Sequence, residues 1–285
     1  MPAKLGVLII HGVGSQKKDF AEPMKKKLRK GICDHAKIRW QPVYWAPILS
    51  RKENNLLRQL FPEGKPPHWF GLRDFVMNYV GDATAYRYIP TSPSQTKKAN
   101  KTYNDIHKKV HEAIVDLRKN LGSADKPVIV MAHSLGSVIM SDYIWDRQNW
   151  DKQKRQDGDP EKKQDEDPYG KTKFERMETL AGLITFGSPI PLFTLAYRPV
   201  KSIKFPPKTL PVNLRKKAKW LNFYDHDDVF GWPLKHLSKS YEDAVTDDFP
   251  INVGLSPLCH HEYWTDNDFT KPVAEYVSEI LKVCP

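Results

Sequence analysis

Cysteine is scarce in this sequence: only Cys33, Cys259 and Cys284 occur in a chain of 285 residues. An odd number of widely separated cysteines does not fit a disulfide framework, and their spacing is not that of a zinc site. Few cysteines and no sign of pairing favour a reducing compartment. We therefore expect a cytoplasmic protein.

Long apolar runs and internal repeats are also missing. No run of about 18 apolar residues occurs, so no segment is predicted to span a membrane. The apolar run at residues 5–10 is too short for the core of a signal peptide, and no small-residue cleavage site follows it. We interpret it as a buried strand, and the whole chain, residues 1–285, as a single domain with insertions.

Positive charge is abundant and concentrated. The net charge is +11, and basic residues crowd residues 25–30 and 198–219, the second stretch containing no acid. Two interpretations stay open, namely attraction to an anionic membrane surface and a solvated face. Because aromatic residues are not regularly interleaved and no nucleic-acid module is visible, nucleic acid is not expected as a partner.

Short apolar runs alternate with helical patterns along the chain. Strands are predicted at residues 5–10, 38–45, 128–131, 180–186, 220–224 and 251–253. Helices are predicted at residues 19–31, 54–61, 72–82, 103–120, 137–145 and 272–283. This alternation indicates an α/β fold, with a mostly parallel sheet covered by helices on both faces and catalytic groups at the carboxyl ends of the strands. Pro42 predicts that its strand lies at an edge or contains a bulge.

Three segments interrupt the alternation. Residues 46–100 are rich in proline, aromatic and apolar residues, which fits either a cap forming a substrate wall or ordinary core packing. Residues 151–173 carry both signs of charge without apolar periodicity, which predicts a mobile surface loop without chemistry. The basic, proline-rich residues 191–219 are interpreted as a second flap.

The most informative stretch is Ala132-His133-Ser134-Leu135-Gly136, which has the form G-x-S-x-G with alanine in the first position. It lies between a predicted strand and a predicted helix. Small residues two before and two after the central serine allow the chain to turn sharply and hold that serine in a strained conformation. Ser134 is therefore predicted to be exposed at the carboxyl end of the sheet, in front of a helix N-terminus that favours an anion. His133 occupies the position where any residue fits.

The polar residues after the later strands complete a possible nucleophilic site. A serine hydroxyl needs a base to take its proton, and histidine is the natural base at neutral pH. A carboxylate then orients the histidine and stabilises its cation. The candidates for the base are His260 and His261, and those for the acid are Asp225, Asp227 and Asp228.

The chain order Ser, Asp, His resembles the α/β-hydrolase superfamily, in particular its lipase-like and esterase-like members. The glycine-containing stretch His11-Gly12-Val13-Gly14 after the first strand resembles the oxyanion loop of that superfamily, and residues 184–189 resemble the strand that follows the elbow. The departures are Ala132 for glycine and Val229 where proline is common, and residues 46–100 match no known cap.

The resemblance implies specific roles. It favours Asp228, in the pattern D-x-[IV]-x, as the acid, and His260, in the pattern H-x-x-Y-W, as the base. It implies that the backbone N–H groups of Val13 and Leu135 form the oxyanion hole. The implied activity is hydrolysis of a small-molecule or lipid carboxylic ester without a metal or organic cofactor. The alternatives are a thioesterase, amidase or acyltransferase with the same triad, or a non-catalytic binding protein.

Overall fold

The structure, a computed structural model, describes residues 2–14, 16–60, 79–89, 100–156, 167, 169–196, 198–254 and 259–285. Within these residues, one sheet contains six strands in the order β2-β1-β3-β4-β5-β6, and every neighbouring pair is parallel. The strands are β1 (Leu5–Ile10), β2 (Ile38–Val43), β3 (Val128–His133), β4 (Leu180–Phe186), β5 (Lys219–Tyr224) and β6 (Asp247–Pro250). The predicted parallel sheet is confirmed.

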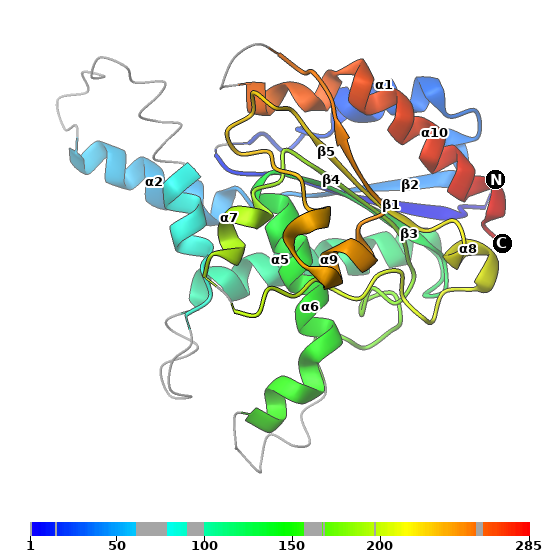
Figure 1. The fold of residues 1–285 in the computed structure, drawn as a ribbon, viewed down its shortest axis with the longest axis horizontal. Helices are drawn as coiled ribbons and strands as arrows, with labels where there is room; N and C mark the ends of the chain where they lie inside the picture. The colour runs from blue at the N-terminus through cyan, green and yellow to red at the C-terminus, as the bar shows by residue number, and fades with distance from the viewer. Residues whose placement is uncertain are drawn as a thin grey trace.

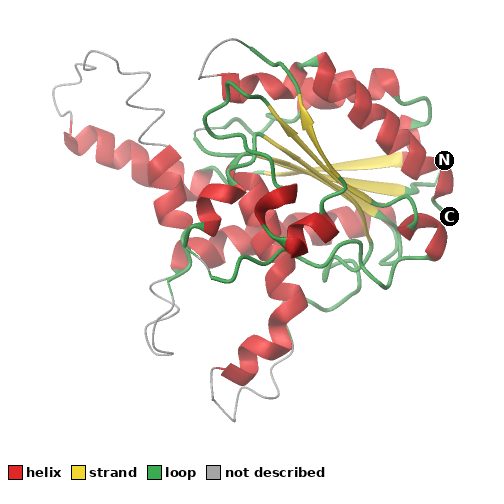
Figure 2. Ribbon diagram, in the orientation of Figure 1, coloured by secondary structure: helices red, strands yellow, loops and turns green. Residues whose placement is uncertain are grey.

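Helices cover both faces of this sheet, as predicted (Figures 1 and 2). On β1, Leu5, Val7 and Ile9 point to one face and Leu8 and Ile10 to the other, so each face has its own apolar core. The first core is completed by α1 (Glu22–Gly31) and α10 (Asn267–Val283), and the second by α5 (Lys101–Leu121) and α6 (Leu135–Gln156). Burial on both faces explains why the central strands are almost continuously apolar.

The two edge strands differ from the central ones. β2 contains Pro42 and lies at the edge of the sheet, where a residue without an N–H group is tolerated; its pairing with β1 is regular. At the other edge the predicted strand at 251–253 is wrong, because β6 occupies Asp247–Pro250. The sequence did not predict this strand because it is acidic. In the fold, the Asp248 carboxylate is accommodated because it accepts hydrogen bonds from the backbone N–H groups of Leu234 and Lys235, both 2.9 Å, and from the Asn222 side chain at 2.7 Å.

Several helices extend beyond their predicted limits. The helix predicted to end at residue 145 is α6, which continues to Gln156, so the prediction of a loop from residue 151 is wrong for its first part; residues 157–166 and 168 lie outside the described residues. α10 begins at Asn267, because the Asp266 side chain accepts a hydrogen bond from the Asp268 N–H at 2.6 Å and so caps the helix. α2 (Pro47–Leu60) begins before its predicted start at residue 54.

The two predicted insertions are described in part. Of residues 46–100, the structure describes α2 and a helix over residues 79–86, while residues 61–78 and 90–99 lie outside the described residues. The stretch 191–219 includes the buried side chains of Ile203, Phe205 and Leu210, which pack into the apolar cores and tie this stretch to the body of the protein.

The remaining short elements are η1 (His35–Lys37), α7 (Ile190–Thr194), α8 (Val212–Arg215), η3 (Lys235–Leu237), α9 (Lys239–Ala244) and η4 (Cys259–Thr265). Among the described helices, none combines the length and apolar character that crossing a membrane requires.

Candidate active site

At the predicted nucleophile elbow, a single residue separates strand β3 from helix α6. β3 ends at His133 and α6 begins at Leu135, which leaves Ser134 between them with a φ of 51°. A serine in this left-handed region is strained, and such strain persists only where the surroundings enforce it. The packed strand and helix on either side supply that constraint.

Two glycines allow the backbone to pass close to Ser134. A Cβ atom at Gly136 would lie 2.6 Å from the His11 carbonyl oxygen, and one at Gly12 would lie 2.3 Å from the Ser134 Cβ. No real Cβ atom approaches another heavy atom so closely. Glycine is therefore required at both positions, and the loop after β1 lies directly against the elbow.

Three side chains from distant parts of the chain meet at this elbow. The Ser134 Oγ lies 2.7 Å from His260 Nε2, and His260 Nδ1 lies 2.8 and 3.0 Å from the two carboxylate oxygens of Asp228. Because the ionised Asp228 only accepts, Nδ1 of His260 carries the proton and Nε2 accepts from the serine hydroxyl. All three residues are buried, Ser134 and His260 completely, so the prediction that Ser134 is exposed is wrong.

The Asp228 carboxylate is held by further donors. It accepts hydrogen bonds from the Phe230 N–H at 3.0 Å and from the Tyr263 hydroxyl at 2.9 Å. Burial on its own would raise the pKa of Asp228, but the contacts with His260, Phe230 and Tyr263 outweigh it, and the pKa lies below its ordinary value. A Cβ atom at Gly231 would lie 2.5 Å from an Asp228 oxygen, so the chain around the carboxylate is closely fitted. Asp228 is therefore an anion over the neutral pH range.

The alternative acids occupy other positions. The Asp225 carboxylate accepts from the Asp227 N–H at 2.8 Å and from the Val253 N–H at 2.6 Å, so it shapes the turn after β5. Asp227 itself is exposed. Of the two candidate bases, His261 is exposed, with its ring centre 5.7 Å from that of His260, and it is His260 that contacts the serine.

The loop predicted to form the oxyanion hole is fixed by His11. The backbone N–H of Trp45 donates to His11 Nε2 at 3.2 Å, so Nδ1 carries the proton and donates to the Gly12 carbonyl at 2.8 Å. Burial lowers the pKa of His11 to about 4, which keeps it neutral. Val13 and Leu135, whose N–H groups are predicted to bind an oxyanion, are both buried, one in the loop after β1 and the other directly after the elbow serine.

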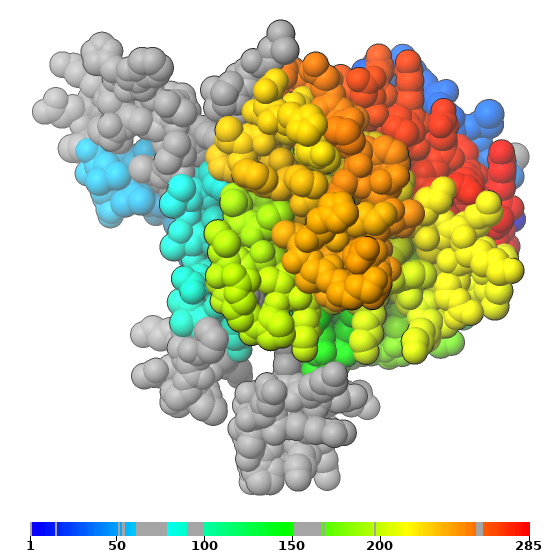
Figure 3. Space-filling view, viewed as in Figure 1, coloured from blue at the N-terminus to red at the C-terminus, as the bar shows by residue number. Residues whose placement is uncertain are grey.

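The helix over residues 79–86 contributes two residues that sequence reasoning missed. The buried Asp82 carboxylate accepts from the Gly14 N–H at 2.8 Å, and the Tyr79 ring packs on Phe230 with centroids 3.7 Å apart. Phe230 and Tyr79 both lie edge-on to His260, at 5.4 and 6.4 Å. In Figure 3 this segment, in cyan, lies beside the yellow-green chain around α7. No sequence pattern relates residue 82 to residue 14, so these contacts had no signal in the sequence.

Two more residues near the triad have contacts that the sequence did not predict. Tyr263 links the turn to the acid, because its hydroxyl donates to Asp228 and accepts from the Asp225 N–H at 2.9 Å. His133, expected at a freely variable position, is instead buried, and its Nε2 lies 2.8 Å from the His260 carbonyl oxygen. The only sequence signal was the presence of a tyrosine and a histidine inside the two motifs.

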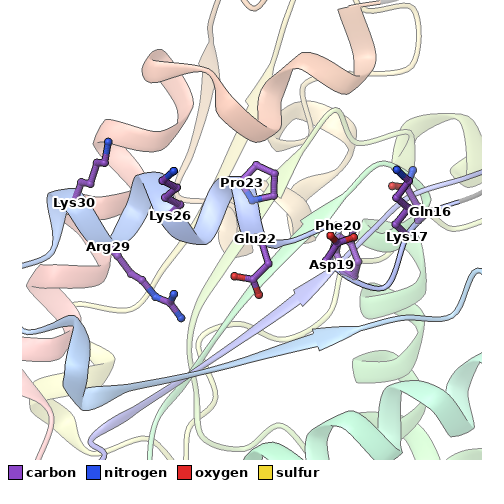
Figure 4. A pocket seen from close by; sticks show the side chains of 9 residues that line it. All are labelled: Gln16, Lys17, Asp19, Phe20, Glu22, Pro23, Lys26, Arg29 and Lys30. Atoms are coloured by element: carbon purple, nitrogen blue, oxygen red, sulfur yellow. The ribbon is translucent and has the colours of Figure 1, made fainter.

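A surface hollow beside α1 is separate from the triad. Its lining includes Lys26, Arg29 and Lys30, together with the acids Asp19 and Glu22. In Figure 4, Lys26 and Lys30 point to one side of α1 while Arg29 and Glu22 point to the other, so the basic groups do not converge on one point. Within the described residues, no group of three or more His, Cys, Asp or Glu side chains is placed to hold a metal ion.

The parallel sheet, the strained serine between β3 and α6, and the chain order Ser134, Asp228, His260 together define an α/β-hydrolase fold. No protein-family model and no curated protein matches the chain. Among solved structures, a chain from work on LipS and LipT, two metagenome-derived lipolytic enzymes, is 14% identical with a TM-score of 0.43, over 99% of this chain and 94% of that one.

Proposed function

We propose that this protein is a serine hydrolase that cleaves a carboxylic ester through an acyl-enzyme on Ser134. The observation that carries the proposal is the continuous chain of short contacts from Ser134 through His260 to the ionised Asp228. A serine in this setting is activated, because the base that takes its proton is already within hydrogen-bond distance and correctly tautomerised.

In the proposed mechanism, the Ser134 Oγ attacks the ester carbonyl while its proton passes to His260 Nε2. The resulting imidazolium is stabilised by Asp228, and the N–H groups of Val13 and Leu135 donate to the oxyanion. His260 then gives the proton to the leaving alcohol. In the second half, water attacks the acyl-enzyme with His260 as the base, releasing the carboxylic acid and restoring Ser134.

Other acyl transfers use the same groups. A thioesterase, an amidase and an acyltransferase share the acyl-enzyme and differ only in the leaving group or the acceptor. A non-catalytic binding protein is disfavoured by the strain at Ser134 and by the burial of three polar side chains that are hydrogen-bonded to one another.

We propose an apolar acyl chain or lipid ester as substrate, because the aromatic rings of Tyr79 and Phe230 lie against His260. The basic stretch 198–219 lies away from the triad: its helix α8 is near both chain termini, at the end of the sheet opposite the elbow (Figure 1).

We therefore propose separately that this stretch contacts an anionic membrane. High salt should abolish that membrane binding without changing the hydrolysis of soluble esters. For the compartment, we propose the cytoplasm.

The proposed function is tested by measuring hydrolysis of p-nitrophenyl esters of increasing acyl length by the wild type and by Ser134→Ala. We expect hydrolysis by the wild type, with a burst of p-nitrophenol equal to the enzyme concentration if deacylation is slow, and loss of both in the variant. Absence of hydrolysis for every ester, thioester and anilide offered to folded protein would contradict the proposal and favour the binding protein.

A further inference from the structure

We infer that His133 is a positioning residue for the base: the Nε2–H of its side chain holds the His260 carbonyl and so fixes the His260 ring against Ser134. This inference rests on the proposed function, because it assigns a role in the chemistry of the same site. The role belongs to the second position of the elbow, between Ala132 and the nucleophile.

The contact joins the two segments whose spacing sets the proton transfer. His133 is the last residue of β3 and adjoins the nucleophile, while His260 lies on η4; the His133 Nε2 and the His260 carbonyl oxygen are 2.8 Å apart. A carbonyl oxygen only accepts, so Nε2 of His133 carries the proton. A single side chain thus links the backbone that carries the base to the residue next to the serine.

The surroundings of the His133 ring leave it little freedom. It is 2% exposed, with ring centres 5.0 Å from Phe186, 5.3 Å from Trp264 and 4.8 Å from His260. Its other nitrogen, Nδ1, faces the oxyanion loop, since a Cβ atom at Gly12 would lie 3.3 Å from it. The ring therefore touches all three parts of the site: the elbow, the oxyanion loop and the histidine segment.

The chemistry of the proposed reaction requires this ring to stay neutral. When His260 takes the serine proton it becomes a cation, and a second cation 4.8 Å away would oppose that step. Burial, with His260 as a further cause, lowers the pKa of His133 well below its ordinary value. A neutral His133 donates its hydrogen bond through the whole cycle, whereas a lysine or arginine donor would add a charge.

Two amide substitutions distinguish a positioning role from simple space-filling. In His133→Gln the side-chain amide nitrogen is as many bonds from Cβ as Nε2 of histidine, so the donor is kept. In His133→Asn it corresponds to Nδ1 instead, and the donor to the His260 carbonyl is lost. Because a displacement of about 1 Å at a catalytic group costs on the order of 100-fold in rate, we expect kcat of the asparagine variant to fall about 10- to 100-fold with little change in KM. The glutamine variant should stay close to the wild type.

The experiment measures kcat and KM for a short p-nitrophenyl ester on the folded fraction of wild type and both variants, with thermal unfolding to establish that fraction. Nitrogen-15 NMR of the wild-type imidazoles is the second measurement, and we expect His133 to show a protonated Nε2 and a neutral ring from pH 5 to 8. Equal losses in both variants, no loss in either, or an Nδ1–H tautomer would overturn the inference. A wild type that hydrolyses nothing overturns the proposed function itself, and NMR would still report whether the hydrogen bond exists.

Discussion

Two clusters among the described residues each combine a histidine, at least one carboxylate and a tyrosine, and only one of them also contains a serine in contact with the histidine. The triad cluster contains Ser134, His260, Asp228 and Tyr263. The second, which we term the tyrosine cluster, contains Tyr86, His107, Asp142, Tyr103 and Asp146. There the Tyr86 hydroxyl lies 2.9 Å from His107 Nε2 and 3.1 Å from an Asp142 oxygen.

The carboxylates of the two clusters are in opposite electrostatic states. Asp228 is surrounded by donors and its pKa is lowered, whereas burial, reinforced by the charge of Asp146, raises the pKa of Asp142 to about 7. His107 is also disfavoured as a cation, because burial and the nearby Arg147 lower its pKa to about 3. In the tyrosine cluster, the acid that contacts Tyr86 is therefore held closer to neutral, although Asp146, whose charge raises the pKa of Asp142, lies 3.5 Å from His107 Nδ1.

The clusters also lie on different parts of the fold. The triad lies at the carboxyl ends of parallel strands, with a serine as the partner of the histidine, while the tyrosine cluster lies between α5, α6 and the helix over residues 79–86. It fastens that helix, which carries Tyr79 and Asp82 of the site, to the body of the protein. A His–Asp–Tyr contact alone is therefore weaker support for an active site than an acid held by several donors together with a serine at the base.

The largest expected effects come from the nucleophile and the base. Ser134→Ala and His260→Gln should each lower kcat for ester hydrolysis by on the order of 10⁴- to 10⁶-fold, because they remove members of one catalytic unit. The matched controls are Ser141→Ala on α6 and His107→Gln in the tyrosine cluster, which should keep wild-type kcat per folded molecule. Equal losses in His107→Gln and His260→Gln would remove the distinction between the two clusters.

The next largest effect on kcat should separate Asp228 of the triad from Asp142 of the tyrosine cluster. Asp228→Asn should lower kcat by on the order of 10³- to 10⁴-fold, because an amide neither stabilises the imidazolium nor fixes its tautomer. Asp142→Asn should leave kcat unchanged, since Asp142 lies in the tyrosine cluster. Steady-state kinetics of the two variants at pH 8 measure the difference, and a loss confined to Asp142→Asn would contradict the assignment of Asp228.

The two tyrosines give a smaller contrast. Tyr263→Phe removes one donor to an ionised carboxylate, a hydrogen bond of about 1.5–3 kcal/mol, and should lower kcat by about 10-fold or more while shifting the pH at which activity falls in acid to a higher value. Tyr86→Phe should leave that pH profile in place. Profiles of kcat/KM between pH 4 and 9 record both effects.

Substitution of Asp142 should have the smallest effect on activity and the clearest effect on the free energy of unfolding. An acid whose folded pKa is raised to about 7 from an ordinary 3.8 is protonated in the folded protein and ionised in the unfolded chain between these values, so its contribution to stability falls as pH rises through that range. Asp142→Asn removes this loss. We expect the free energy of unfolding of the variant to exceed that of the wild type by a few kcal/mol above pH 7 and by little near pH 4.

Urea unfolding at pH 4, 5.5 and 8 tests this expectation. His107 is present in both proteins, and its lowered pKa makes stability fall as pH decreases below its ordinary value, so the difference between the two proteins isolates Asp142. A difference independent of pH would show that Asp142 is not protonated in the folded protein.

The sequence predicted the sheet and the elbow because both have strong local signals. Three of the strands, β1, β3 and β4, are nearly continuous apolar runs, and the small residues around Ser134 reflect a steric need within a few residues. β6 was missed because its Asp248 is satisfied by bonds to Leu234 and Lys235, which only the folded chain brings near. Local pattern cannot show such partners.

The same limit applies around the site. Ser134, Asp228 and His260 are motif residues, and the structure brings these three together. Asp82 and His133 could not be assigned, because the bond from the Gly14 N–H to Asp82 and that from His133 to the His260 carbonyl join positions far apart in the sequence. Hydrogen bonds between a side chain and a distant backbone group have no characteristic sequence separation, so they cannot be predicted from the sequence.

Labelling with a fluorophosphonate probe, followed by peptide mapping, shows whether Ser134 is an activated nucleophile. We expect one phosphonyl group per molecule, on the peptide that contains Ser134, with labelling lost in Ser134→Ala and His260→Gln and kept in Ser141→Ala and His107→Gln. Labelling that persists in Ser134→Ala, or that maps to another residue, would contradict this expectation.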